Sequence, residues 1–181
     1  MKANGSGLLE IMCAAIEIKE KMKTLYADAA GKCNDSVGTE TFEILRDMEQ
    51  KHLERLRAIY ADLAKGANDL DSCMFYDFGS LNRSKVAKKI RQTGEGLSKA
   101  CLDDVAAIES GMELENSSID FFLDKLKAAS APVEREFLNN MIAEERSHYI
   151  MLADLRFYYI DTEHWFMEKA KTGLDGAGGG A

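Results

Sequence analysis

The chain contains 181 residues, of which 46% are hydrophobic and 30% are charged. This length suits one domain or at most two, and the apolar fraction is enough for a substantial core, which excludes a wholly disordered chain. The 23 basic and 31 acidic residues give a formal net charge of -8, which argues against a nucleic-acid-binding protein and against a basic protein of membrane surfaces.

The first half of the chain predicts two helices, since the composition has one proline and few β-branched residues. The first helix runs from about residue 8 to 30 and the second from about residue 36 to 65. Gly31 ends the first helix, and Asn34-Asp35-Ser36 offers a cap for the second, so a short link predicts an antiparallel hairpin. The side chains predicted to face inward are Leu8, Met12, Ala15, Met22, Tyr26, Phe42, Leu45, Leu56 and Ile59.

The second half predicts another hairpin, with helices from about residue 97 to 129 and from about 132 to 160. Ser130 is the predicted cap of its second helix, and Pro132 lies just inside that helix. The inward residues of its first helix are Leu102, Val105, Ile108, Met112, Ile119, Phe122 and Leu126.

A long connection over residues 66–96 joins the two hairpins, at about 8–65 and 97–160. Two hairpins with a long crossover are typical of the ferritin-like form of the four-helix bundle. We therefore predict an all-α bundle domain over residues 1–165 and a C-terminal tail with a glycine-rich end over residues 166–181. Within the crossover, the basic stretch from Arg83 to Arg91 is interpreted as a solvated helix face rather than a nucleic-acid site.

The cysteines and the N-terminal region indicate a cytoplasmic location. Cys13, Cys33, Cys73 and Cys101 form no CxxC pair, which excludes zinc-knuckle and rubredoxin-type sites and predicts reduced thiols that act as small hydrophobic residues. The apolar stretch over residues 8–18 is interrupted by two glutamates, so no signal peptide or membrane span fits it.

An internal duplication marks the candidate site. A constant shift of 96 residues, 145 minus 49, places Glu49 on Glu145 and His52 on His148. Further pairs under this shift are Tyr26 with Phe122, Glu17 with Glu113, Val37 with Val133 and Leu56 with Leu152. The duplicated element is therefore a Glu-x-x-His motif at matched positions of two helices.

Each Glu-x-x-His pair lies on the predicted core face of its helix, because residues three apart share one face. Burial of a carboxylate and an imidazole among leucines is costly unless something pairs with them, and a metal ion can pair with both copies at once. Carboxylate and imidazole donors suit iron, manganese or zinc. The alternative is that both histidines are core residues satisfied by hydrogen bonds.

The first and third helices carry different residues at the position that faces the two Glu-x-x-His motifs. Glu115 lies on the inward stripe of the third helix and adds a further carboxylate, whereas its counterpart in the first helix is Lys19. Two positions are open for Lys19: its ammonium leaves the site, or the ammonium takes the place of one cation among the carboxylates. Helical spacing places Glu17 on the outer face and Glu20 at the flank.

The chain resembles the ferritin-like domain of the rubrerythrin family in three segments: "MELENSSIDFF", "AEERSHYIML" and "HWFMEKAKTGLDG". The resemblance implies a di-iron centre that reacts with peroxide or oxygen, and a homodimer. Electrons would come from a separate donor protein, because the chain has no CxxC for a rubredoxin domain. The metal ligands implied by the resemblance are Glu49, His52, Glu115, Glu145 and His148.

Several roles stay open at this stage. Tyr26 and Phe122 either line the metal pocket or act only as core aromatics. The aromatic patch at residues 75–78 and Trp165-Phe166 serve either dimerisation or internal packing. The rival to a peroxidase-type oxidoreductase is a degenerate bundle in which Lys19 replaces a ligand and the protein has a structural or interaction role.

Overall fold

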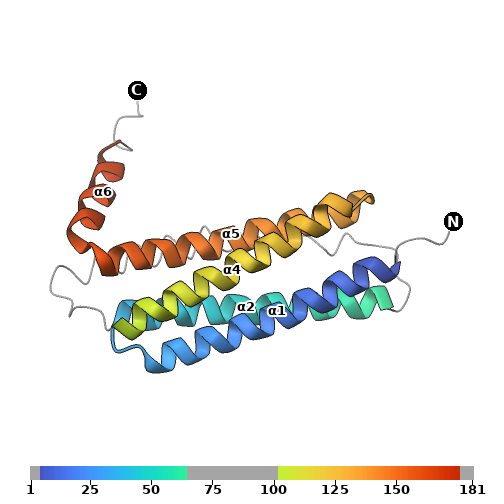
Figure 1. The fold of residues 1–181 in the computed structure, drawn as a ribbon, viewed down its shortest axis with the longest axis horizontal. Helices are drawn as coiled ribbons and strands as arrows, with labels where there is room; N and C mark the ends of the chain where they lie inside the picture. The colour runs from blue at the N-terminus through green and yellow to red at the C-terminus, as the bar shows by residue number, and fades with distance from the viewer. Residues whose placement is uncertain (1–4, 65–101, 176–181) are drawn as a thin grey trace.

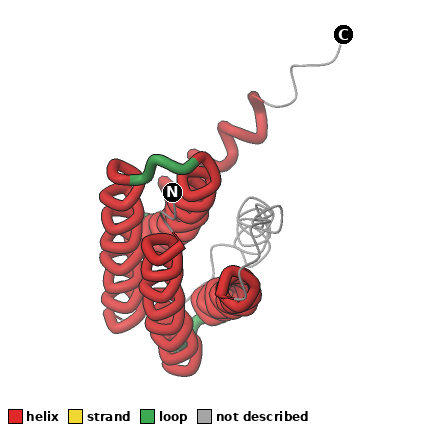
Figure 2. Tube along the Cα trace, turned by 90° about the vertical axis from the view of Figure 1, so that its right-hand side faces the viewer, coloured by secondary structure: helices red, strands yellow, loops and turns green. Residues whose placement is uncertain are grey.

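The computed structural model describes residues 5–64 and 102–175, and all regular structure in these ranges is α-helical. Four long helices lie side by side as a bundle, and a shorter fifth helix leads away from it (Figures 1 and 2). The helices are α1 (Gly5–Lys32), α2 (Ser36–Ala64), α4 (Leu102–Ala128), α5 (Pro132–Ile160) and α6 (Thr162–Asp175). The predicted all-α class is confirmed for the described residues. The predicted crossover, its aromatic and basic stretches, Cys73 and Cys101 lie outside them, as does the predicted start of the third helix near residue 97.

The predicted link between α1 and α2 is confirmed. Only residues 33–35 separate the two helices, which run antiparallel (Figure 1). The Asp35 carboxylate accepts a hydrogen bond from the Gly38 backbone N–H at 2.9 Å and thereby caps α2. The same carboxylate oxygen accepts a hydrogen bond from the Tyr159 hydroxyl at 2.7 Å, so this cap also ties the turn to the end of α5.

Gly38 permits the close approach of Tyr159 to this turn. A Cβ atom at Gly38 would collide with the Tyr159 hydroxyl and lie 2.6 Å from the Cys33 Sγ atom. We expect Gly38→Ala to lower the free energy of unfolding by about 1–3 kcal/mol, measured by urea titration, because both neighbours would have to shift. Gly31→Ala is the matched control: a Cβ there meets nothing within 4 Å, and alanine should leave stability unchanged or raise it by up to about 1 kcal/mol. Equal effects of the two substitutions would contradict the steric explanation.

The link between α4 and α5 is also short, but its cap differs from the prediction. Pro132 occupies the first turn of α5 as predicted, whereas the N-cap residue is Ala131, with no side-chain cap hydrogen bond. The prediction of Ser130 as the cap is therefore wrong. Ala131 is extended, with φ -73° and ψ 132°, because a residue before proline avoids the helical conformation. At the end of α4, the Arg135 guanidinium donates hydrogen bonds to the carbonyls of Leu126 and Ala129, at 3.0 and 2.9 Å, which satisfies acceptors that the helix leaves free.

Two apolar clusters fill the bundle, one on either side of its middle. All nine inward side chains predicted for the first two helices are buried. In α4, Ile108, Ile119 and Phe122 are buried, whereas Val105, Met112 and Leu126 are half-buried. Each of the four long helices contributes residues to both clusters, and the stretch between the clusters carries the polar residues of the candidate site. The site is thus enclosed by apolar layers above and below, which exclude water from it.

The helix α6 is not among the four predicted helices, and the predicted boundary between domain and tail at residues 165 and 166 falls inside it. Trp165 anchors α6 to α5: it is fully buried and meets the Tyr158 ring edge-on, with ring centroids 5.6 Å apart. Its indole N–H donates a hydrogen bond to Asp154 at 3.1 Å. These contacts favour internal packing over dimerisation as the role of Trp165.

None of the described helices combines the length and the apolar character needed to cross a lipid bilayer.

Candidate metal centre

A layer of polar side chains crosses the middle of the bundle, and we call it the polar layer. It consists of Lys19, Glu49, His52, Glu115, Glu145 and His148. All six are buried, and all except His52 are fully so. The structure therefore brings together the five predicted metal ligands and the lysine that stands at the sixth position. The helical period explains the arrangement, because these residues continue the stripes of buried apolar residues along α1, α2, α4 and α5.

The Lys19 ammonium lies inside the layer, between two carboxylates. Its Nζ atom is 2.9 and 3.1 Å from the two oxygens of Glu49 and 2.9 and 3.0 Å from those of Glu145. Burial by itself lowers the pKa of this ammonium, but Glu145 and Glu49 outweigh burial and raise the pKa above its ordinary value. Of the two positions left open by the sequence, the structure shows the second geometry: the ammonium lies in the core among the carboxylates.

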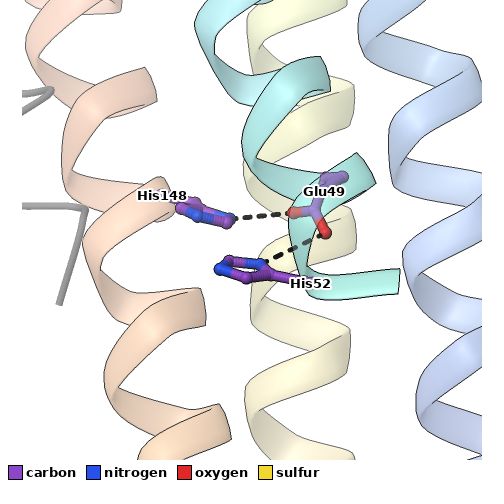
Figure 3. Close-up of side chains that lie close together, drawn as sticks. All are labelled: Glu49, His52 and His148. Atoms are coloured by element: carbon purple, nitrogen blue, oxygen red, sulfur yellow. Dashed lines mark ion pairs between the residues drawn. The ribbon is translucent and has the colours of Figure 1, made fainter. Parts of the chain in front are cut away.

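His148 contacts Glu49 and Glu115. Its Nδ1 atom is 2.9 Å from a Glu49 oxygen and 3.4 Å from a Glu115 oxygen, and Figure 3 shows the contact with Glu49. Burial alone would lower the pKa of His148, but Glu115 and Glu49 outweigh it and raise the pKa to about 10. In the absence of a metal ion this imidazole is therefore protonated at neutral pH.

Tyr26 contacts the layer directly. Its hydroxyl donates a short hydrogen bond to the Glu115 oxygen that also faces His148. Burial, followed by the Glu115 carboxylate, raises the pKa of Tyr26 well above its ordinary value, so the phenol keeps its proton. Tyr26 thus lines the candidate site and orients Glu115, whereas Phe122 is a buried member of the neighbouring apolar cluster.

His52 lies at the edge of the layer. Its ring stacks on that of His148, with centroids 5.5 Å apart, and its Nδ1 atom is 3.8 Å from a Glu49 oxygen (Figure 3). Its other ring nitrogen, Nε2, is 3.3 Å from the Glu144 carboxylate.

The sequence analysis missed Glu144, because the shift of 96 residues pairs it with Met48 rather than with another acidic residue. Its spacing of four residues from His148 on one helix was the available signal.

The pKa values of the three glutamates in the layer shift in two directions. Burial raises the pKa of Glu49, but Lys19 and His148 outweigh burial and hold it well below its ordinary value. The pKa of Glu115 is shifted in the same direction, with burial outweighed chiefly by His148. Burial raises the pKa of Glu145 above its ordinary value, opposed by Lys19 and assisted by the neighbouring Glu115 carboxylate.

The metal-free layer already holds charges of both signs that compensate one another. Lys19 and His148 are positive, and Glu49 and Glu115 are negative. The layer can therefore exist as a salt-bridge network alone, and a metal ion bound there would take over the charge that His148 carries with its proton.

The donor atoms fit a metal ion. Within the described ranges, one group of donors within 4.8 Å of one another comprises Glu49, His52 and His148, and a second comprises Glu49, Glu115, Glu145 and His148. Ligands about 2.0–2.2 Å from a metal and at right angles lie about 3 Å apart, which matches the spacing of His148 Nδ1 from the Glu49 and Glu115 oxygens. A buried Glu115 oxygen, Oε2, also makes no hydrogen bond. This cluster of carboxylate and imidazole groups can hold a metal ion, and the donor set suits iron, manganese or zinc.

No family model, curated protein or solved structure matches the chain. The resemblance to the rubrerythrin family therefore stays a hypothesis that depends on the residues and motifs of the chain itself.

Proposed function

We propose that this protein is a ferritin-like bundle that binds one divalent metal ion in the polar layer. The ligands in this proposal are Glu49, Glu115, Glu145 and His148, the four-donor group of the site. The observation that carries it is the position of the Lys19 ammonium, within 3.1 Å of both oxygens of Glu49 and of Glu145. In the di-metal arrangement of such bundles a glutamate would stand at position 19, so we assign the Lys19 ammonium the place of one metal ion.

Iron is the metal that the resemblance to rubrerythrins implies, and bound iron would supply redox chemistry toward peroxide or oxygen with electrons from a separate donor protein. The chain's own residues prepare the site for such an ion. Lys19 fixes the two carboxylates it contacts, and Tyr26 orients Glu115 through its hydroxyl. The apolar clusters on both sides exclude water, which strengthens every electrostatic contact in the layer.

A cytoplasmic location belongs to the same proposal. Cys13 and Cys33, the two cysteines in the described ranges, are free thiols, as expected in a reducing compartment. The homodimer and the donor protein are further predictions from the resemblance.

The second candidate function is a structural or interaction role without a metal. The observation that favours it is the charge balance of the metal-free layer, since Lys19 and His148 already compensate Glu49 and Glu115. A layer of this kind needs no ion for stability. Its unfolding transition would therefore be the same with and without a chelator.

The deciding measurement is metal content per chain, by elemental analysis after anaerobic loading with Fe²⁺. We expect about one iron per chain in the natural sequence and about two in Lys19→Glu, because the new carboxylate completes the ligand set of the second position. Lys21→Glu is the matched control: Lys21 is exposed on the same helix, so its iron content should equal that of the natural sequence.

Three results would contradict this proposal in different ways. Two irons per chain in the natural sequence would mean that the Lys19 side chain leaves the site. No bound iron, with an unchanged melting temperature, would favour the structural role. An unchanged content in Lys19→Glu would show that the ammonium does not occupy a metal position.

A further inference from the structure

Among the described side chains of the polar layer and the adjacent Glu144, only two have surface exposed to solvent. Lys19, Glu49, Glu115, Glu145 and His148 have no exposed surface. The side chains of His52 and Glu144 are 7% and 10% exposed. Among the described polar side chains, these two therefore mark the edge of the layer that lies nearest to solvent.

His52 connects this edge to the centre. Its Nε2 atom is 3.3 Å from Glu144, and its Nδ1 atom, on the other side of the ring, is 3.8 Å from Glu49. Glu49 in turn contacts His148 at 2.9 Å. The order from solvent inward is thus Glu144, His52, Glu49 and His148, with a possible metal donor at each step and no gap longer than 3.8 Å between successive groups.

The Glu144 carboxylate has few partners for a buried group. Neither of its oxygens makes a hydrogen bond, although both are buried atoms, and among the described residues its ion-pair contact is with the His52 ring. A buried carboxylate held by a single ion-pair contact is costly, and burial raises its pKa. In its ionised form, this carboxylate at the mouth of a buried site would attract a cation from solvent.

We infer that Glu144 and His52 form the entry port of the site, where a divalent cation is captured by Glu144 and passed by His52 to the Glu49, Glu115, Glu145 and His148 group. This inference rests on the proposed function, because it assumes that the inner group binds the ion. It assigns Glu144 a role in the rate of loading and none in the final coordination. His52 belongs to both the port and the three-donor group with Glu49 and His148.

The test is the rate at which the metal-free protein takes up Co²⁺, followed by stopped-flow absorbance of the bound ion, together with the final Co²⁺ content. We expect Glu144→Gln to slow uptake about tenfold or more, at an unchanged final content per chain, because the capturing charge is lost. Glu144→Asp keeps the charge and should restore most of the rate. Glu136→Gln removes the same charge from an exposed position of the same helix and should leave the rate within about twofold.

The outcomes separate the port from the proposed function. Co²⁺ uptake by Glu144→Gln at the rate of the natural sequence would overturn the port and leave the metal-binding proposal standing. A lower final content in Glu144→Gln would also overturn it, because Glu144 would then be a ligand. A natural sequence that binds no Co²⁺ would overturn the metal-binding proposal and the port with it. Urea unfolding of each metal-free variant verifies that a slower rate does not come from misfolding.

Discussion

Replacement of Lys19 by methionine is expected to lower the free energy of unfolding of the metal-free protein by about 3–5 kcal/mol. Methionine has a similar length and fills the same space, but it leaves Glu49 and Glu145 without the ammonium that both contact at 2.9 Å. Removal of one partner from a buried ion cluster leaves uncompensated charge in a site that water does not reach. The measurement is urea unfolding in the presence of a chelator, followed by circular dichroism.

Lys21→Met is the control for this substitution. Lys21 lies two residues away on the exposed face of α1, and its replacement should change stability by no more than about 0.5 kcal/mol. Addition of Mn²⁺ should stabilise Lys19→Met more than the natural sequence, because the ion then supplies the positive charge that the substitution removes. A loss below about 1 kcal/mol in Lys19→Met would contradict the view that this ammonium holds the carboxylates together.

The affinity for Mn²⁺ is expected to rise steeply with pH. A metal ligand must be deprotonated, whereas His148 in the metal-free layer has a pKa raised to about 10 by Glu115 and Glu49 against the effect of burial. Binding therefore expels this proton at every pH below about 10, and the affinity should increase about tenfold per pH unit between pH 6 and 8.

Calorimetric titrations in buffers of different ionisation enthalpy measure the number of protons released. His164→Gln is the control, since His164 is an exposed residue of α6 and its loss should not alter the slope. An affinity that does not change between pH 6 and 8 would show that His148 is not a ligand. Such a result would leave only the carboxylates of Glu49, Glu115 and Glu145 to bind the ion.

Much of the fold was predictable because it follows from local spacing. Apolar residues at helical intervals identified the four long helices, and the short links near residues 31–36 and 129–132 identified the hairpins. The cap of α5 differs from the prediction for a local reason, because Pro132 keeps the residue before it extended and makes Ala131 the N-cap. Tertiary packing decided the last helix: the burial of Trp165 stabilises α6, for which the sequence analysis made no prediction.

The residues of the candidate site were also predictable, for a different reason. Carboxylates and imidazoles on a core face are costly, and a duplication that preserves Glu49 and His52 as Glu145 and His148 marks them as one group. The duplication could not identify Glu144, which has no counterpart in the first half. Its spacing of four residues from His148 indicates only that the two share one face of α5. Its contact with His52 joins α5 to α2, and spacing along one helix does not encode a contact between two helices.

By itself the sequence determined the helical class, the faces that turn inward and the set of acidic, basic and imidazole side chains that meet there. It left the Lys19 side chain with two directions, because a lysine stem can pack along a helix with its ammonium in solvent or in the core. Only the tertiary structure decided between them. The separation of α1, α2 and α5 places two carboxylates around the Nζ atom, and their combined attraction exceeds the cost of burying its charge.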